Sequence, residues 1–309
     1  MAGILCVGEM VIDFLPGQET GSYIRKPGGA PANVAVAAAR NGVTAGFCGR
    51  VGDDDFGRFL MGVLKENNVQ ALCPEPVQEA ITTMAFVSLD EHGDRSFTFA
   101  RKPGADMFLT CADVDRAFEM APQIIHAGSC SLSRDPAADA TAYAMEKAAK
   151  AGIPVSFDVN YRNLMWNDDR SAAAAAIQKV LPFVDYLKIS EEEEDLLGGT
   201  IPEVMEKNNI AVLVKTLGGD GSECFWNGQS IRIPGRKANC VDTTGAGDAF
   251  WGGFLSTLIK AGLPAPEEAL LTRALTYGNI AGWLCVQKKG AMESLPTTAE
   301  VEAILEAEA

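Results

Sequence analysis

Long hydrophobic runs are absent from this sequence of 309 residues. No stretch approaches the roughly 20 apolar residues that a membrane-spanning helix needs. The N-terminal segment has no basic residues ahead of an apolar run, so residues 4–7 (ILCV) are typical of a core strand rather than of a signal peptide. We therefore expect no membrane partner.

Positive charge is also scarce. The chain carries 26 Lys and Arg against 41 Asp and Glu, and its formal net charge is −15. Nucleic acids and anionic membranes both attract basic surfaces, so we expect no nucleic-acid partner. A site for an anionic ligand would have to build its positive potential locally, from backbone N–H groups, a few Lys or Arg side chains and a divalent ion.

Clusters of metal-binding side chains are lacking as well. The eight cysteines are scattered singly, none in a CxxC pair, and the chain has two histidines, which argues against a zinc site. Several of the cysteines lie in apolar runs, where a free thiol behaves as a small hydrophobic group. Free thiols are typical of a reducing compartment, so we expect a cytoplasmic protein.

The sequence does contain a regular alternation of short apolar runs and longer helical ones. Strands are expected at residues 4–7, 45–51, 124–127, 155–158, 186–189 and 211–215, and helices at 32–40, 55–66, 137–150, 171–180, 249–260 and 267–284. Apolar strands interleaved with helices predict an α/β fold, a doubly wound, mostly parallel sheet with helices on both faces. No linker divides the chain, so residues 1–309 are expected to form one domain.

One region departs from this rhythm. Residues 81–89 and 95–100 flank the turn at 90–94, which is typical of a β-hairpin. Within the first of these runs, Thr83, Ala85 and Val87 alternate with bulkier or more polar residues, so the two faces of this strand should differ. The hairpin could form an edge of the main sheet or a separate small sheet.

Residues 242–250 (DTTGAGDAF) are the most informative segment. Two glycines precede an apolar helix, and the free N–H groups and dipole of such a helix start favour an anion. Asp248 places a negatively charged carboxylate at this position, which would otherwise favour a bound anion. It could serve only as a helix cap. A base that takes a proton from a hydroxyl during phosphoryl transfer is the alternative that explains the whole run.

A second glycine-rich segment, residues 28–35 (GGAPANVA), precedes another helix. Pro31 suits the first helical turn. Asn33 is the one polar side chain on an otherwise small, apolar helix start. It could satisfy local backbone groups, but a ligand hydroxyl is the partner that its position beside a diglycine favours.

These two segments resemble the C-terminal and N-terminal signatures of the ribokinase-like (PfkB) carbohydrate kinases, and fructokinases in particular. Further landmarks occur in the family's order along essentially the whole chain, at residues 51–54 (VGDD), 158–162 (DVNYR), 190–193 (SEEE) and 216–221 (TLGGDG). The resemblance implies the ribokinase-like fold with a small β-lid over the sugar, built from about residues 14–26 and 81–101.

The resemblance also implies roles for individual residues. Asp248 would be the general base, and Gly245, Ala246 and Gly247 would donate N–H groups to the transferring phosphoryl oxygens. The residues expected to bind the sugar are Asp13, Gly29, Asn33, Arg101 and Arg162. Asp13 could instead be a turn residue, and either arginine could belong to a surface ion pair.

The nucleotide and its ions have their own expected residues. ATP would meet Lys188, Ser190, Thr216, Gly218, Gly221 and Asn279, and Mg²⁺ would be held indirectly by Glu193. The family has Asn where this chain has Ser190, and many relatives have Pro where it has Val159. A monovalent cation, expected to be K⁺, would lie near Asp242, Thr244, Gly290 and Ser294.

The function expected from all of this is ATP-dependent phosphorylation of a primary sugar hydroxyl, fructose to fructose 6-phosphate. A 2-keto-3-deoxygluconate kinase is a near alternative, because Arg101 and Arg162 could bind an acidic sugar, and a nucleoside or riboside stays open. A non-catalytic sugar- or nucleotide-binding regulator is an alternative of another class. A dinucleotide oxidoreductase is set aside, since no GxGxxG follows the first strand. A homodimer is expected if the lid pairs across subunits.

Overall fold

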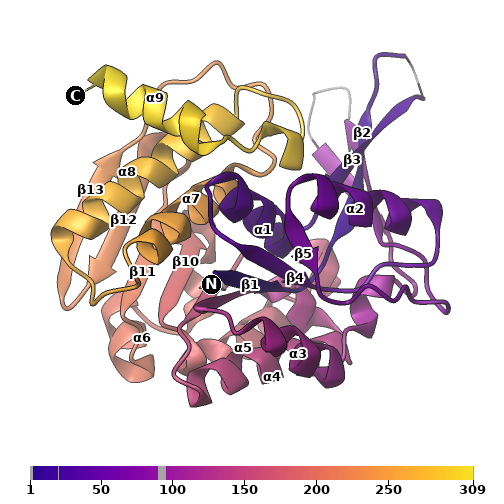
Figure 1. Ribbon diagram of the computed structural model, residues 1–309, viewed down its shortest axis with the longest axis horizontal. Coiled ribbons are helices and arrows are strands. Elements are labelled where there is room, and N and C mark those ends of the chain that lie inside the picture. The colour runs from indigo at the N-terminus through magenta and orange to yellow at the C-terminus, as the bar shows by residue number, and fades with distance from the viewer. Residues whose placement is uncertain (1–2, 20, 90–94, 309) are drawn as a thin grey trace.

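Parallel strands make up most of the central sheet. The computed structural model describes residues 3–19, 21–89 and 95–308, and within them the sheet has nine strands in the order β13-β12-β11-β10-β9-β8-β1-β4-β5 (Figure 1). The strands are β1 (Ile4–Val7), β4 (Ala45–Cys48), β5 (Val69–Ala71), β8 (Ile124–Gly128), β9 (Val155–Asp158), β10 (Tyr186–Ser190), β11 (Val212–Thr216), β12 (Gly221–Trp226) and β13 (Gln229–Pro234). Pairing is parallel from β11 to β5 and antiparallel across β11, β12 and β13.

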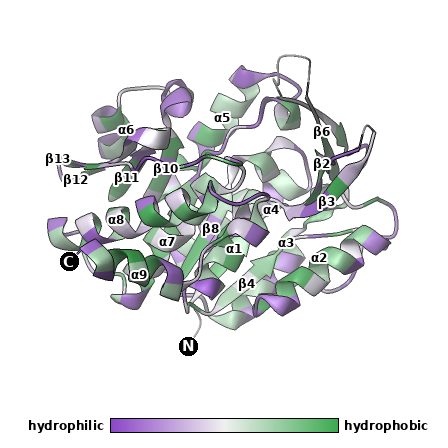
Figure 2. Cartoon of the chain, turned by 90° about the horizontal axis from the view of Figure 1, so that it is seen from above, coloured by the Kyte–Doolittle hydropathy of each residue, from purple (hydrophilic) through white to green (hydrophobic). Residues whose placement is uncertain are grey.

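Helices cover both faces of this sheet. They are α1 (Ala30–Arg40), α2 (Asp55–Glu66), α3 (Cys111–Ala117), α4 (Ala137–Lys150), α5 (Arg170–Val180), α6 (Ile201–Asn208), α7 (Ala246–Lys260), α8 (Glu268–Cys285) and α9 (Thr298–Glu308). Figure 2 shows hydrophobic residues along the central strand β8 and both kinds of residue along the outer helices α2 and α9. None of the helices in the described ranges is long and apolar enough to cross a membrane.

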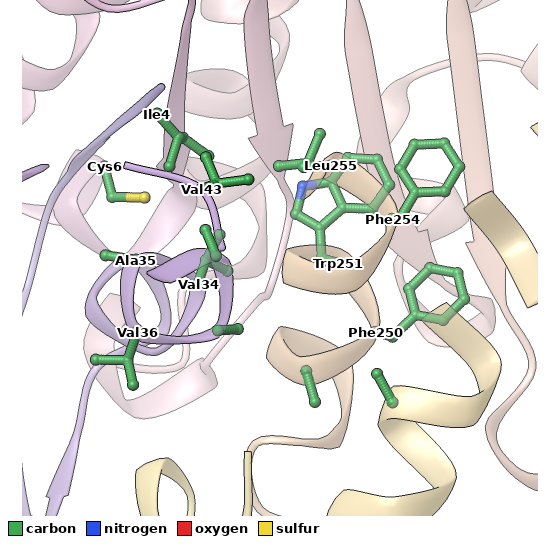
Figure 3. Close-up of a cluster of buried hydrophobic side chains, with 14 of the residues drawn as sticks. Ile4, Cys6, Val34, Ala35, Val36, Val43, Phe250, Trp251, Phe254 and Leu255 are labelled. Carbon is green, nitrogen blue, oxygen red and sulfur yellow. The ribbon is translucent and has the colours of Figure 1, made fainter. Parts of the chain in front are cut away.

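Two hydrophobic cores result from the alternation of side chains along the strands. In β1, Ile4 and Cys6 belong to one buried cluster, which α1 and α7 complete with Val34 and Trp251 (Figure 3). Leu5 and the other alternate residue of β1 belong to a second cluster on the opposite face, shared with α4 and α5. Because every residue of β1 is buried, the strand reads as apolar throughout. The expected doubly wound α/β fold is confirmed.

Most predicted boundaries agree with the structure to within one or two residues. The strand predicted at 45–51 is too long, because β4 ends at Cys48 and the Val51 carbonyl then accepts from the Val77 amide in a neighbouring loop. The prediction omitted three strands and three helices, namely β5, β12, β13, α3, α6 and α9. β13 alternates between exposed and half-buried residues, so it lacks the apolar run by which the other strands were found.

The hairpin belongs to a separate four-stranded sheet, so the alternative of an edge on the main sheet is wrong. Its order is β3-β2-β6-β7, with β2 (Val11–Pro16), β3 (Tyr23–Gly28), β6 (Met84–Leu89) and β7 (Arg95–Ala100). β2 and β6 are parallel, and the other two pairs are antiparallel. The expected turn at 90–94 lies outside the described residues.

Aromatic side chains fasten this small sheet to the main body. On one face Phe14 stacks on Phe86 with ring centroids 4.8 Å apart, and Phe14 also meets the edge of Phe56 on α2 at 5.6 Å. Arg25 of β3 lies over the ring of Phe59, 3.8 Å from its centroid. The inner face, with Ala85 and the other buried residues of β6, is left to face the body of the protein.

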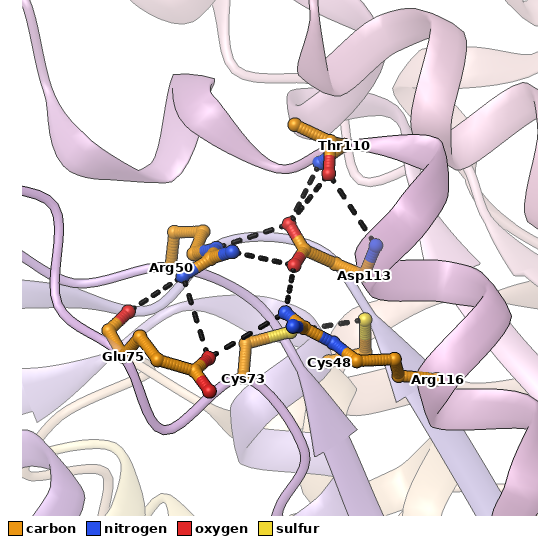
Figure 4. A network of polar contacts seen from close by, with 7 residues as sticks. All are labelled: Cys48, Arg50, Cys73, Glu75, Thr110, Asp113 and Arg116. Carbon is orange, nitrogen blue, oxygen red and sulfur yellow. Dashed lines mark hydrogen bonds and ion pairs between the residues drawn. The ribbon is translucent and has the colours of Figure 1, made fainter.

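A polar network anchors α3 beside the end of β4 (Figure 4). Thr110 and Asp113 form a capping box at the start of α3, and the Asp113 carboxylate accepts from Arg50 at 2.5 and 3.0 Å and from Arg116 at 2.6 Å. Asp113 is buried, and these donors hold its pKa below its usual value although desolvation opposes the shift. Cys48 lies nearby in the same figure.

Substitution of Asp113 by Ala is expected to lower the free energy of unfolding by about 3 kcal/mol, because both the helix cap and the charged hydrogen bonds are lost. Urea unfolding of the purified variant measures this. Asp115→Ala is the matched control, since Asp115 lies on the same helix in an exposed pair with Lys147 and should change stability much less. Equal losses in the two variants would contradict the argument.

Candidate active site

The first turn of α7 forms the centre of the site. The helix begins at Ala246, three residues earlier than expected, so Asp248 lies in the first turn rather than before it. Gly245 caps the helix with φ of 81°, and a Cβ there would lie 3.0 Å from the Cα of Ala291, so only glycine fits. The Ala246 amide, one of the three expected phosphoryl donors, instead donates to the Thr243 carbonyl at 3.2 Å.

Asp248 is buried and held by a neighbouring helix. Its side chain is 9% exposed, and its Oδ2 accepts a hydrogen bond of 2.7 Å from Nδ2 of Asn33 on α1. Desolvation raises the pKa of Asp248, while the bond from Asn33 opposes the rise. α1 and α7 can approach closely because Gly252 faces Ala37. Two residues that lie 215 positions apart in the sequence thus meet in one hydrogen bond.

A cavity of about 410 Å³ opens beside this carboxylate. Seven of the residues expected at the sugar, the base or the anion site line it, namely Asp13, Gly29, Asn33, Arg162, Gly245, Gly247 and Asp248, and so do Lys188 and Thr244. The small sheet contributes apolar walls from Val11, Leu15, Ala85, Val87 and Phe99. The cavity is therefore polar toward the two helix starts and apolar toward the small sheet.

Two carboxyl groups in this cavity have strongly raised pKa values. Burial raises the pKa of Asp13 to about 7, with Arg162 opposing the rise and Asp242 and Asp248 adding to it. Burial also raises the pKa of Glu9 to about 7. Glu9 carries no signal in the sequence, because an acid after a short apolar strand is an ordinary loop residue until the topology places it beside the start of α1.

Lys188 lines the cavity of the base and not the one lined by the nucleotide loop. Its Nζ forms a buried ion pair of 2.8 Å with Asp158, and a Cβ at Gly247 would lie 3.3 Å from that nitrogen. Neighbouring acids, Asp158 first, hold the pKa of Lys188 above its usual value although desolvation, the largest cause, opposes them. Lys188 therefore carries a positive charge at the start of α7.

A second cavity of about 910 Å³ lies on the other side of the α7 start. It is lined by four of the residues expected at the nucleotide, Thr216, Gly218, Gly221 and Asn279. Three cationic side chains that the sequence analysis did not select, Arg232, Arg236 and Lys237, line it as well, together with Phe250 and Trp283. Both cavities include Thr243 and Gly247, so they meet at the first turn of α7.

Some expected residues lie outside both cavities. Arg101 is paired with Asp106 at 2.7 Å and donates to Ser133 at 3.0 Å, and it lines neither cavity. Glu193 forms a capping box with Ser190, and its two carboxylate oxygens accept from the backbone amides of Ser190 (2.8 Å) and Tyr161 (2.7 Å).

The four residues expected around a monovalent cation lie on two loops that are joined by hydrogen bonds. Asp242 is buried, and it accepts from the side chain of Thr244 at 2.6 Å and from the amide of Gly290 at 3.0 Å. The hydroxyl of Ser294 donates to the Gly290 carbonyl. Asp242 thus links the loop before α7 to the loop after α8.

Comparison with known proteins agrees with this geometry. Residues 1–298 match the pfkB family of carbohydrate kinases. Fructokinase-2 of Zea mays is 37% identical to this chain, over 98% of this chain and 93% of its own length.

Solved structures agree along the whole chain. A fructokinase from Xylella fastidiosa with bound ATP has a TM-score of 0.90 and 30% identity, covering 99% of this chain and 98% of that one. A fructokinase from Vibrio cholerae O395 with fructose, ADP and calcium ion bound has a TM-score of 0.85 and 35% identity, covering 99% of both chains. A double-mutant form of that fructokinase holds fructose, ADP and potassium ion (TM-score 0.85, 34% identity, 99% and 98% covered). The chain therefore belongs to the pfkB family of carbohydrate kinases and is a phosphotransferase that acts on a sugar.

Proposed function

We propose that this enzyme transfers the γ-phosphoryl group of ATP to a primary hydroxyl of fructose, forming fructose 6-phosphate. The observation that carries the proposal is the meeting of two cavities at the first turn of α7. The smaller one suits a monosaccharide, and the larger one, lined by three cations, suits a nucleotide triphosphate. Asp248 lines the smaller one, at the helix turn where they join.

Asp248 is the proposed general base. Its carboxylate accepts the proton of the sugar hydroxyl as the hydroxyl oxygen attacks the γ-phosphorus. Asn33 donates a hydrogen bond to Oδ2 of Asp248, which leaves Oδ1 of Asp248 to accept the proton. The amides of Gly245 and Gly247 and the ammonium of Lys188 face the charge that develops on the phosphoryl group.

The four-stranded sheet is the proposed lid. Its inner face supplies the apolar wall of the smaller cavity through Ala85, Val87 and Phe99. An apolar cover over the sugar excludes water, which would otherwise compete with the sugar hydroxyl for the phosphoryl group.

Mg²⁺ is proposed to enter with the nucleotide, since ATP reacts as its metal complex and the ion neutralises phosphate charge. Glu193 fits an indirect role, because both its oxygens already accept backbone amides and so orient the Tyr161 and Ser190 backbone. Arg232 and Lys237 supply local positive potential that a chain of net charge −15 needs in order to bind an anion, whereas Arg236 on the same wall is paired with Glu308.

We further propose that K⁺ activates the enzyme by binding beside Asp242. Replacing potassium by sodium in the assay is expected to lower kcat several-fold, because the ion supports the loop that leads directly into the α7 start. Initial rates in matched chloride salts measure this. The same kcat without potassium as with it would contradict the proposal.

An ADP-release assay against a sugar panel tests the substrate. With MgATP and potassium, fructose should give the highest kcat/KM among fructose, 2-keto-3-deoxygluconate, ribose, glucose and several nucleosides. The sugar acid should be disfavoured, because Glu9 and Asp13 place two acidic groups in the smaller cavity, where the described lining residues add Arg162 and the paired Lys188 as cations. Turnover of the keto acid alone would replace the proposed substrate, and ATP binding without turnover of any sugar would favour a non-catalytic regulator.

A further inference from the structure

Glu9 is a buried acid that the proposed chemistry does not use. It follows β1 and lines the smaller cavity, the residue is 3% exposed, and its Oε2 has no hydrogen-bond partner among the residues that the structure describes. Buried polar atoms without partners are uncommon in folded proteins, and each one calls for an explanation. At the wall of a ligand cavity, the explanation to test first is a polar atom of the ligand.

The charges around Glu9 do not offset the effect of burial on its carboxyl group. The Arg101 cation lowers the pKa of Glu9, but it is also paired with Asp106 and donates to Ser133. Asp106 adds a negative charge, and Cys130 contributes an uncharged thiol whose own pKa is raised by burial. Burial is the main reason that the pKa of Glu9 rises to about 7, and the backbone amides of Glu9 itself and of Ala30 oppose the rise.

The position of Glu9 relative to the base is set by α1. The Glu9 carboxyl lies beside the amide of Ala30, the first residue of α1, and the Gly29 backbone packs against the backbone of Glu9. Asn33, which holds Asp248, lies one helical turn farther along α1, about 4.5 Å along the helix axis. Glu9 and Asp248 therefore line the same cavity from successive turns of α1, Glu9 at its first residue and Asp248 at Asn33.

We propose that the Glu9 carboxyl binds a hydroxyl of the sugar at the end of the molecule remote from Asp248, and that Glu9 is thereby a specificity-determining residue. This inference rests on the proposed function. A carboxyl group accepts from a hydroxyl and, when protonated, also donates, so it suits an uncharged polyhydroxyl ligand. The Glu9 carboxyl would therefore favour sugars that carry a hydroxyl at the carbon it faces over sugars that lack one.

Glu9→Met, Glu9→Gln and a set of monodeoxy sugars test the proposal. Met has a similar length and no hydrogen-bonding group, so Glu9→Met should raise the sugar KM about 10- to 100-fold and leave the KM for ATP within about twofold. Gln keeps an acceptor and a donor, so Glu9→Gln should restore most of the sugar affinity. Glu206→Gln, an exposed acid on α6 far along the chain, is the matched control and should behave like the unsubstituted enzyme.

The deoxy sugars separate contact from structural support. For one monodeoxy fructose, the loss of affinity seen with the unsubstituted enzyme should disappear in Glu9→Met, because both changes remove the same hydrogen bond. Two results would overturn this inference and leave the proposed function standing. One is a loss of affinity for every deoxy sugar that is as large in Glu9→Met as in the unsubstituted enzyme, and the other is an unchanged sugar KM in Glu9→Met. If Glu9→Met does not fold, Glu9→Ala, which also lacks a hydrogen-bonding side chain, is assayed with the same sugars, and discrimination equal to that of the unsubstituted enzyme would overturn the inference. Failure of the unsubstituted enzyme to phosphorylate any sugar would overturn the proposed function and this inference with it.

Discussion

Substitution of Asp248 by Asn is expected to lower kcat by about 10²- to 10⁴-fold, the contribution of a positioned general base. Asn has the same shape and still accepts the hydrogen bond from Asn33, so the geometry of the α7 start is kept while the proton acceptor is lost. Because burial raises the pKa of Asp248, kcat of the unsubstituted enzyme should also fall as the pH is lowered through that pKa, since the protonated acid cannot act as a base.

The readout that identifies a base is a loss in kcat without a loss in binding. ATP and sugar affinities of Asp248→Asn, measured by calorimetry, should stay within a few-fold of those of the unsubstituted enzyme. Asp169→Asn is the matched control, because Asp169 is also an acid at a helix start, caps α5 and is exposed. A kcat for Asp248→Asn within tenfold of the control would contradict the assignment.

Hydrophobic periodicity was sufficient to predict the layers of this fold. The central strands are largely apolar because both faces of the sheet are buried, and β1 and β9 were predicted to the residue. The same rule could not find β12 or β13, since these antiparallel strands at the edge leave part of their side chains exposed. It also missed α6, a short helix that has as many charged residues as buried ones.

Site residues were predictable only where one short sequence segment contains the whole structural feature that they form. A glycine-rich helix start is visible in one segment, so Gly245 and Asp248 could be selected before the fold was known. The pair of Lys188 with Asp158 depends on the parallel neighbours β10 and β9, and no local pattern shows it. The same holds for Glu9, which becomes a cavity residue only when β1 ends beside the start of α1.

Substitution of Asp13 by Asn is expected to lower kcat/KM for the sugar by about 10²- to 10³-fold, with little change in the KM for ATP. A carboxylate that accepts from two neighbouring hydroxyls contributes two charged hydrogen bonds, and an amide can accept only part of them. Sugar affinity should also decrease as the pH falls below about 7, where Asp13 becomes protonated. Steady-state rates at several pH values measure both effects.

The same substitution should make the protein more stable. The pKa of Asp13 is about 7 in the folded chain, whereas an aspartate in an unfolded chain has a pKa of about 4. The unfolded chain therefore releases this proton first, so stability declines as the pH rises from about 4 to 7 and stays reduced above 7. Asp13→Asn removes that cost, roughly 2–4 kcal/mol at most, and its Tm should exceed that of the unsubstituted enzyme at pH 8.

The gain in Tm should shrink toward zero near pH 4, because there both states of the unsubstituted protein hold the proton. Asp169→Asn is again the control, since Asp169 is exposed and its pKa is lowered rather than raised, so that substitution should not stabilise the protein at pH 8. A variant that binds sugar less well and unfolds at a higher temperature would identify Asp13 as an acid kept in the cavity for the ligand at the expense of the fold. A Tm that falls at every pH would instead mean that the Asp13 carboxyl supports the strand on which it lies.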